Sequence, residues 1–144
     1  MRISVTKQGG YIREIMDSKT VDKSALSIKD ALAKAKDFLK KTGYNSMEEN
    51  YYVASGNVLT VNFAYVEDGV TCYTDMIKVS VSMKDGSIMG FEATGYIMSH
   101  CERDFNVSIT ESAARAKVSP LLTVQSSRLT LIPTDGKYEK LCYE

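Results

Sequence analysis

The sequence contains no tryptophan, only two prolines and a single histidine, and its 18 basic residues balance its 18 acidic ones. One histidine cannot supply the three or four converging ligands of a typical zinc site. Zero net charge argues against a surface dedicated to nucleic acid or to an anionic membrane. No run of residues is long and apolar enough to span a bilayer, and the first residues lack the apolar core of a signal peptide. The chain is therefore either cytosolic or a piece of a longer exported protein, and composition leaves both open.

Cysteine is scarce and irregularly spaced. Cys72, Cys101 and Cys142 match no CxxC pattern of a zinc or redox site, and three cysteines cannot all pair within one chain. We interpret them as free, partly buried thiols. The sequence also lacks the P-loop, Rossmann and nucleophile-elbow motifs.

No set of side chains that could perform catalysis emerges from the remaining polar residues. His100 and Cys101 are neighbours, and on a strand they would point to opposite faces, so the histidine is poorly placed to activate the thiol. Asp75 and Asp104 could be imagined as the carboxylate pair of a glycosidase, but nothing in the sequence brings them together. We therefore predict that the protein is not an enzyme and that it has no cofactor and no metal site.

Residues 50–98 dominate the rest of the chain. Three turn signals, Ser55-Gly56-Asn57, Asp68-Gly69 and Asp85-Gly86, divide this stretch into four apolar runs. Apolar and polar residues alternate in the second and third runs, and this period of two predicts strands with one buried face. The apolar positions are Leu59, Val61, Phe63 and Tyr65, then Ile77, Val79, Val81 and Met83. Short connections make the strands antiparallel, so we expect a four-stranded meander whose apolar face needs a cover.

A helix that precedes this meander is the obvious cover. Ser27 is a suitable N-cap, Asp30 completes a capping-box pattern, and Gly43 is a natural C-terminal stop. Apolar residues recur at helical spacing and form one stripe. We expect the stripe residues Leu32, Ala35, Phe38 and Leu39 to pack on Val61, Phe63, Val79 and Val81, or on the neighbours of these residues on the opposite face of the sheet.

Shorter elements flank this core and suggest a repeated unit. Residues 3–15 predict a hairpin around Gly9-Gly10, a second helix is expected from Ser108 to near Pro120, and strands are expected at residues 129–132 and 138–143, joined by a turn at residues 133–136. The predicted fold class is α+β, with tandem units that each pack one helix on an antiparallel meander. Residues 1–21 would be the trailing hairpin of a preceding unit, residues 22–100 a complete unit, and residues 101–144 part of a following one. We expect a cut chain, which would leave the edge of its last strand without a partner from a following unit. The N-terminal hairpin could then pair with this edge, or a second copy of the chain could do so in a homodimer.

These residues resemble a known family. The helix SIKDALAKAKDFL, followed by a DG turn and a GxI strand, resembles the PepSY domain, a small non-catalytic module of secreted peptidase propeptides and bacterial envelope proteins. A larger set of segments resembles the C-terminal region of the YpeB family of spore germination proteins. These segments are Gly56-Asn57, residues 62–65, residues 75–79, residues 90–93, Gly95-Tyr96, residues 100–103, Arg128-Leu129, residues 131–133 and residues 139–144.

The resemblance implies a function that composition and periodicity do not. It implies a protein that is not an enzyme and that lies outside the inner membrane of the dormant spore, attached through a segment outside this chain. It also implies a protein partner, a cortex-lytic hydrolase such as SleB, with each partner stabilising the other. The alternatives are a module that binds a small ligand or peptidoglycan as a sensor, and a general peptidase-inhibitory PepSY module.

Five residues are candidates for partner binding: Tyr51, Tyr52, Tyr73, His100 and Arg103. An edge strand can pair with an extended partner segment, and tyrosines beside it could supply specificity. The competing interpretation is that the tyrosines form cross-strand packing pairs. His100 and Arg103 belong to the densest polar cluster, residues 100–104, which we otherwise interpret as a surface connector with a hydrogen-bonded histidine.

Overall fold

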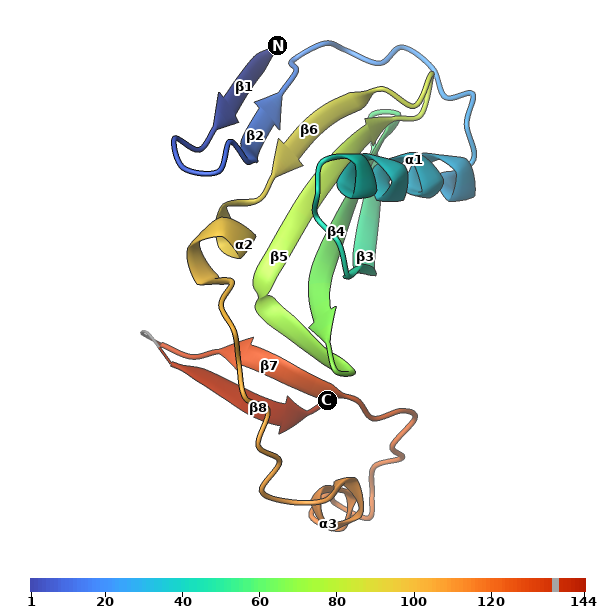
Figure 1. Ribbon diagram of the computed structural model, residues 1–144. Coiled ribbons are helices and arrows are strands. Elements are labelled where there is room, and N and C mark those ends of the chain that lie inside the picture. The colour runs from blue at the N-terminus through green and yellow to red at the C-terminus, as the bar shows by residue number, and fades with distance from the viewer. Residues whose placement is uncertain (136–137) are drawn as a thin grey trace.

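The computed structural model describes residues 1–135 and 138–144, and over these residues the chain forms a mixed α+β fold (Figure 1). Six strands lie side by side in the order β1 (Arg2–Val5), β2 (Ile12–Met16), β6 (Ile88–Glu92), β5 (Val70–Ser82), β4 (Val58–Glu67) and β3 (Met47–Ser55). Two more strands, β7 (Leu129–Pro133) and β8 (Glu139–Tyr143), extend the sheet from β5. The helices are α1 (Ile28–Lys41), α2 (Thr94–Ser99) and α3 (Glu111–Arg115). The predicted α+β class is confirmed.

The central meander also forms as predicted. Strands β3, β4, β5 and β6 are antiparallel neighbours in chain order. Between β4 and β5, Asp68 and Gly69 have φ values of 49° and 78°, the positive-φ pair that a type I′ turn requires. The fourth apolar run does not remain a strand, because β6 ends at Glu92 and residues 94–99 turn into α2.

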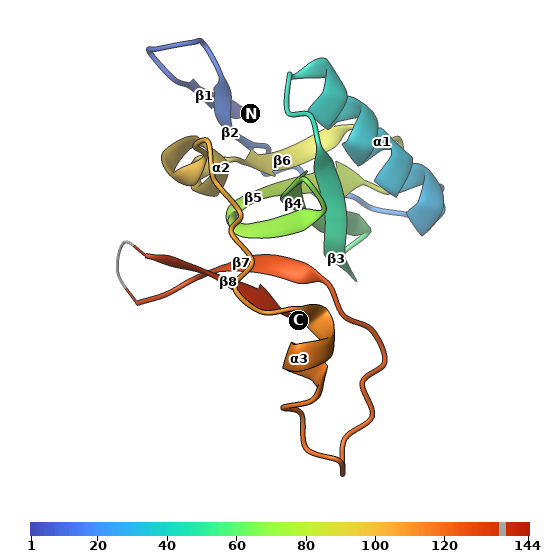
Figure 2. The same ribbon diagram turned by 60° about the horizontal axis from the view of Figure 1, so that its bottom comes forward.

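Helix α1 covers the apolar face of this meander (Figure 2). Its N-cap is Ser27, whose hydroxyl accepts a hydrogen bond from the Asp30 amide at 3.1 Å. Its C-terminus closes with Gly43 at a φ of 86° and with the Tyr44 amide donating to the Leu39 carbonyl at 3.0 Å, a Schellman motif. The predicted packing is confirmed, since one core cluster contains the stripe residues and the inward residues of β4 and β5.

The N-terminal hairpin joins the same sheet. Strand β2 pairs with β6 in antiparallel register, with Ile15 opposite Phe91. The predicted hairpin around Gly9-Gly10 is therefore confirmed. The alternative in which it pairs with the C-terminal strand is wrong, because β8 pairs with β7 instead.

The C-terminal region departs most from the sequence analysis. Strand β7 lies parallel to β5, with Thr130 opposite Thr71, and not within a purely antiparallel meander. Helix α3 is far shorter than expected and begins at a different cap, since Thr110 and not Ser108 accepts the capping hydrogen bond. It buries no residue, so the expectation that it lies on a sheet is wrong. Short alanine-rich helices bury little apolar area and are marginal without a packed face.

Strands β7 and β8 form at the predicted places. The expected turn at residues 133–136 falls partly outside the described residues. A small second core of Val70, Cys72 and Leu131 holds β7 against β5. How the chain divides into repeated units stays a prediction. Within the described residues, none of the helices is both long and apolar enough to cross a membrane.

Candidate functional site

A buried ionic cluster joins the central meander to the C-terminal hairpin. The guanidinium of Arg103 donates from two nitrogens to the two oxygens of Asp75, both at 2.8 Å. The same group donates to both oxygens of Glu139 at 2.9 Å and to the Ser99 carbonyl at 2.9 Å. The Asp75 side chain is 0% exposed and the Arg103 side chain 7%. Arg103 therefore links β5, the segment after α2, and β8.

His100 completes this cluster from the end of α2. Its Nδ1 lies 2.8 Å from the Asp75 carboxylate, and its ring stacks on Tyr96 with centroids 4.2 Å apart. The expectation of a hydrogen-bonded histidine is confirmed. The connector interpretation is wrong for Arg103, whose side chain is buried.

The electrostatics of the cluster favour a structural role, in which the ion pairs join β5 to β8, over a catalytic one. Hydrogen bonds to Asp75 raise the pKa of Arg103, and the Arg103 hydrogen bond lowers the pKa of Glu139. Burial raises the pKa of the nearby Cys72 thiol to about 11, so this thiol is protonated and unreactive at neutral pH. Among the described residues no group of three His, Cys, Asp or Glu side chains is placed to hold a metal ion.

A second feature is the exposed outer strand β3. It is the last strand of the sheet on its side, and a bulge between Glu49 and Tyr51 interrupts its pairing with β4. Tyr51, Tyr52 and Val53 are 53%, 48% and 56% exposed. Residues 50–55 contain no charged side chain and no proline. This half of β3 therefore offers a bare strand edge with aromatic side chains on it.

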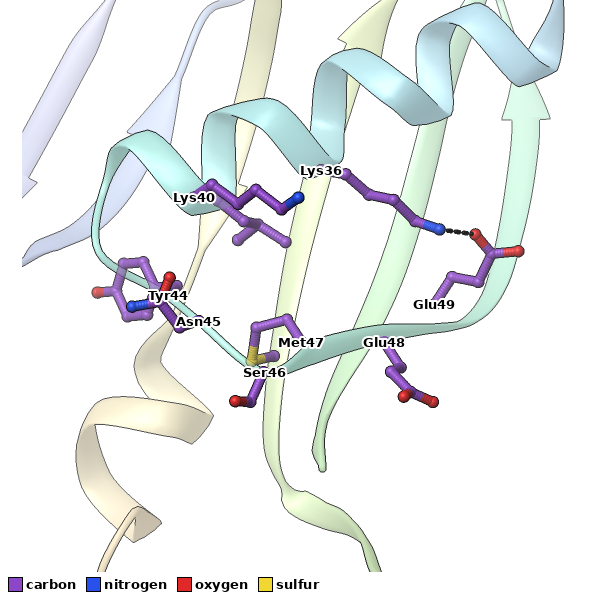
Figure 3. A pocket seen from close by; sticks show the side chains of 9 residues that line it. Lys36, Lys40, Tyr44, Asn45, Ser46, Met47, Glu48 and Glu49 are labelled. Atoms are coloured by element: carbon purple, nitrogen blue, oxygen red, sulfur yellow. Dashed lines mark ion pairs between the residues drawn. The ribbon is translucent and has the colours of Figure 1, made fainter. Parts of the chain in front are cut away.

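A pocket of about 370 Å³ lies where β3 begins, beneath the C-terminal half of α1 (Figure 3). Lys36 spans one side of it and pairs with Glu49, with Nζ and Oε2 2.8 Å apart. Lys40 lines the same pocket. The bare edge of β3 is thus flanked at its start by both acidic and basic groups.

The structure separates the five candidate residues into three places. His100 and Arg103 meet at Asp75. Tyr73 lies elsewhere, where its hydroxyl donates to Glu144 at 2.7 Å and is also contacted by Arg128. Tyr51 and Tyr52 lie on the outer strand.

Sequence reasoning missed the partners of Arg103. Asp75 does not approach Asp104, which is exposed, and instead binds Arg103. One signal was available, because Asp75 has the same strand parity as the buried Ile77 and Val79. A charged residue at an inward position needs a buried partner. Whether any of the five candidates contacts a partner stays a prediction.

Comparison with known proteins gives consistent matches. Residues 1–106 match the family model "YpeB sporulation, PepSY1 and PepSY2 domains". The chain is 32% identical over 143 residues to a sporulation protein YpeB of Halalkalibacterium halodurans and 30% identical over 145 residues to that of Bacillus subtilis strain 168. Each match covers 99% of this chain and 32% of the relative, so the chain spans about a third of these proteins.

A solved structure matches as well. The Bacillus megaterium YpeB C-terminal domain superposes with a TM-score of 0.87 at 31% identity, and the match covers 98% of this chain and 63% of that one. These relatives are named as sporulation proteins and not as enzymes. The family match covers well over half of the sequence, and the sequence and structure matches extend over nearly all of it. The chain therefore belongs to the YpeB sporulation family and carries its PepSY-domain region.

Proposed function

We propose that this chain is a non-catalytic PepSY module of a spore germination protein, and that it binds a cortex-lytic hydrolase through the outer edge of β3. The family assignment supports a role in sporulation and germination. The resemblance described above is the reason for choosing a hydrolase such as SleB as the partner, and for placing the module outside the spore inner membrane. The observation that carries the proposal is the bare edge at residues 51–55.

An unpaired strand edge exposes a row of main-chain donors and acceptors, and natural proteins usually protect it with charges, proline, bulges or short length. The first half of β3 has such protection, with Glu48, Glu49 and the bulge. The second half, Tyr51–Ser55, has none and would present about 17 Å of strand at 3.3–3.4 Å per residue. An extended partner segment could add to it through main-chain hydrogen bonds, with Tyr51 and Tyr52 contacting alternate side chains.

The other edge in the main sheet is less suited to this role. Strand β1 is only four residues long and has a bulge between Ser4 and Val5. An ion pair between Arg2 and Glu14 lies beside it, at 3.0 Å. Short length, a bulge and charge are the devices that discourage strand addition.

Two substitutions on β3 test the proposal. Tyr52→Lys places a charge on the bare edge, and Tyr51→Ala removes an exposed ring without touching the core. We expect each to weaken binding of a purified cortex-lytic hydrolase, measured by calorimetry, by about tenfold, or ~1.4 kcal/mol. The melting temperature should barely move, because both side chains are about half exposed.

Tyr138→Ala is the matched control, since this tyrosine is 78% exposed and lies beside β8. Unchanged hydrolase binding by both β3 variants would contradict the assignment of the edge. Pairing of two copies through β3 is the competing outcome, and sedimentation would then report a dimer that the Tyr52→Lys variant lacks.

A further inference from the structure

An aromatic groove shares His100 with the ionic cluster and Tyr44 with the pocket at the start of β3, but it contains no residue of the β3 edge. It has a volume of about 860 Å³ and opens between the β1–β2 turn, the α1–β3 connection and α2. Four rings line it: Tyr11, Tyr44, Tyr96 and His100. Its size falls within the range of small-molecule sites, which are mostly apolar and aromatic with a few polar groups.

The inner wall of this groove is held in place by the core. Tyr44 is buried and donates its hydroxyl to the Ile12 carbonyl at 2.6 Å. Its ring meets Tyr96 edge-on at 5.3 Å, and Tyr96 stacks on His100 at 4.2 Å. Because Asp75 fixes the other side of the histidine, these rings are positioned before any ligand arrives.

The outer wall is Tyr11, whose ring lies over the backbone of the β1–β2 turn. A Cβ at Gly9 would overlap this ring, and Gly9 also has a φ of 77°, so glycine is needed there for two reasons. The Tyr11 side chain is nevertheless 53% exposed. A large aromatic surface is thus held at the mouth of the groove and remains open to solvent.

The polar groups of the groove indicate what it could take. The hydroxyls of Tyr11 and Tyr96 form no hydrogen bond with any described residue, and Gln8 and Lys7 lie at the rim. No carboxylate lines the groove in the part of the chain that the structure describes, and Lys7 carries its only full positive charge. A ligand with apolar faces, several hydroxyl or amide groups and either no charge or a negative charge would be complementary to this groove.

We propose that this groove binds a carbohydrate, specifically a short oligosaccharide that carries a carboxylate. A pyranose ring offers an apolar C–H face to an aromatic ring and hydroxyls at its edge, which matches the exposed ring of Tyr11 and the hydroxyl of Tyr96 in the groove lining. A carboxylate on the sugar would face Lys7. A proline-rich peptide also docks in aromatic grooves, but it offers mainly carbonyl acceptors and leaves the acceptor capacity of the tyrosine hydroxyls unused.

A titration followed by amide chemical shifts tests the proposal. The probes are an N-acetylglucosamine tetramer, which is neutral, and muramyl dipeptide, an amino sugar with a carboxylate. We expect both to shift the amides of Gly9, Gly43 and Ile97, which line the groove, and to leave Gly56 and Gly69 unmoved. Lys7→Gln should weaken the binding of muramyl dipeptide and leave the binding of the neutral tetramer unchanged.

Tyr11→Ala and Tyr51→Ala form a matched pair, because both tyrosines are 53% exposed. Tyr11→Ala should weaken sugar binding by about tenfold, the size expected for loss of one stacking surface of ~1.4 kcal/mol. Tyr51→Ala should leave sugar binding unchanged while it weakens hydrolase binding, so the two proposals fail separately. Melting temperatures of both variants equal to that of the unsubstituted protein would exclude unfolding as the cause of weaker binding.

Three results would overturn the assignment: no shift of the groove amides at millimolar sugar, shifts that persist unchanged in Tyr11→Ala, or shifts produced by a proline-rich peptide and by neither sugar.

Discussion

Replacing Arg103 by alanine removes the centre of the buried ionic cluster. In the folded protein its guanidinium satisfies both oxygens of Asp75, which is fully buried, and both oxygens of Glu139. The alanine variant would leave the Asp75 charge in the interior with only His100 and the Thr74 hydroxyl as neighbours. Removing one partner of a buried ion pair typically costs about 3–5 kcal/mol, because the other charge loses its compensation.

Arg128→Ala is the control for this substitution. Arg128 pairs with Glu144 at 3.1 Å, and both side chains are about half exposed. Exposed pairs contribute roughly 0.2–1 kcal/mol, so this variant should lose little stability. Urea denaturation measures both free energies of unfolding, and hydrogen exchange should show the largest loss of protection in β7 and β8. A loss below about 1 kcal/mol for Arg103→Ala would refute the view that Asp75 depends on this arginine.

Three further predictions follow from the same packing and charges. The Arg103 hydrogen bond lowers the pKa of Glu139 in the folded state below its ordinary value of 4.5. This contribution is therefore present above pH 4.5 and lost as pH falls through the folded-state pKa, so Glu139→Gln should flatten the acid limb of a stability–pH curve. Leu39, which is 2% exposed, lies between α1 and the sheet, and Leu39→Ala should lower the free energy of unfolding, measured by urea denaturation, by about 2–5 kcal/mol. A loss under about 1 kcal/mol would contradict the packing of α1 on the sheet. The chain should cleave neither cortex peptidoglycan nor casein, and turnover abolished by one substitution in it would contradict a non-catalytic module.

Much of the central meander could be predicted because its signals are local. A positive-φ turn at Asp68-Gly69 depends on the two residues themselves. The cap at Ser27 and the stop at Gly43 likewise act within one helical turn. Alternation in β4 and β5 then determines which face needs a cover, and the stripe of α1 matches it.

Other features depend on contacts between distant residues, and no local pattern specifies them. The parallel pairing of β7 with β5 brings residues 71 and 130 together, and α2 forms where an apolar run suggested a continuing strand. A helix alone cannot show whether a sheet will cover it, which is why the marginal α3 was predicted too long.

The sequence by itself determined the turns, the cap and the buried faces, because these follow from the φ preferences and the hydrophobic period of neighbouring residues. Only the tertiary structure decided which charges meet. Asp75, Arg103 and Glu139 are far apart in the chain, and the cost of burying one charge is offset only when folding brings the others within hydrogen-bond distance. The aromatic groove is of the same kind, since three separate segments build it and none contains it alone.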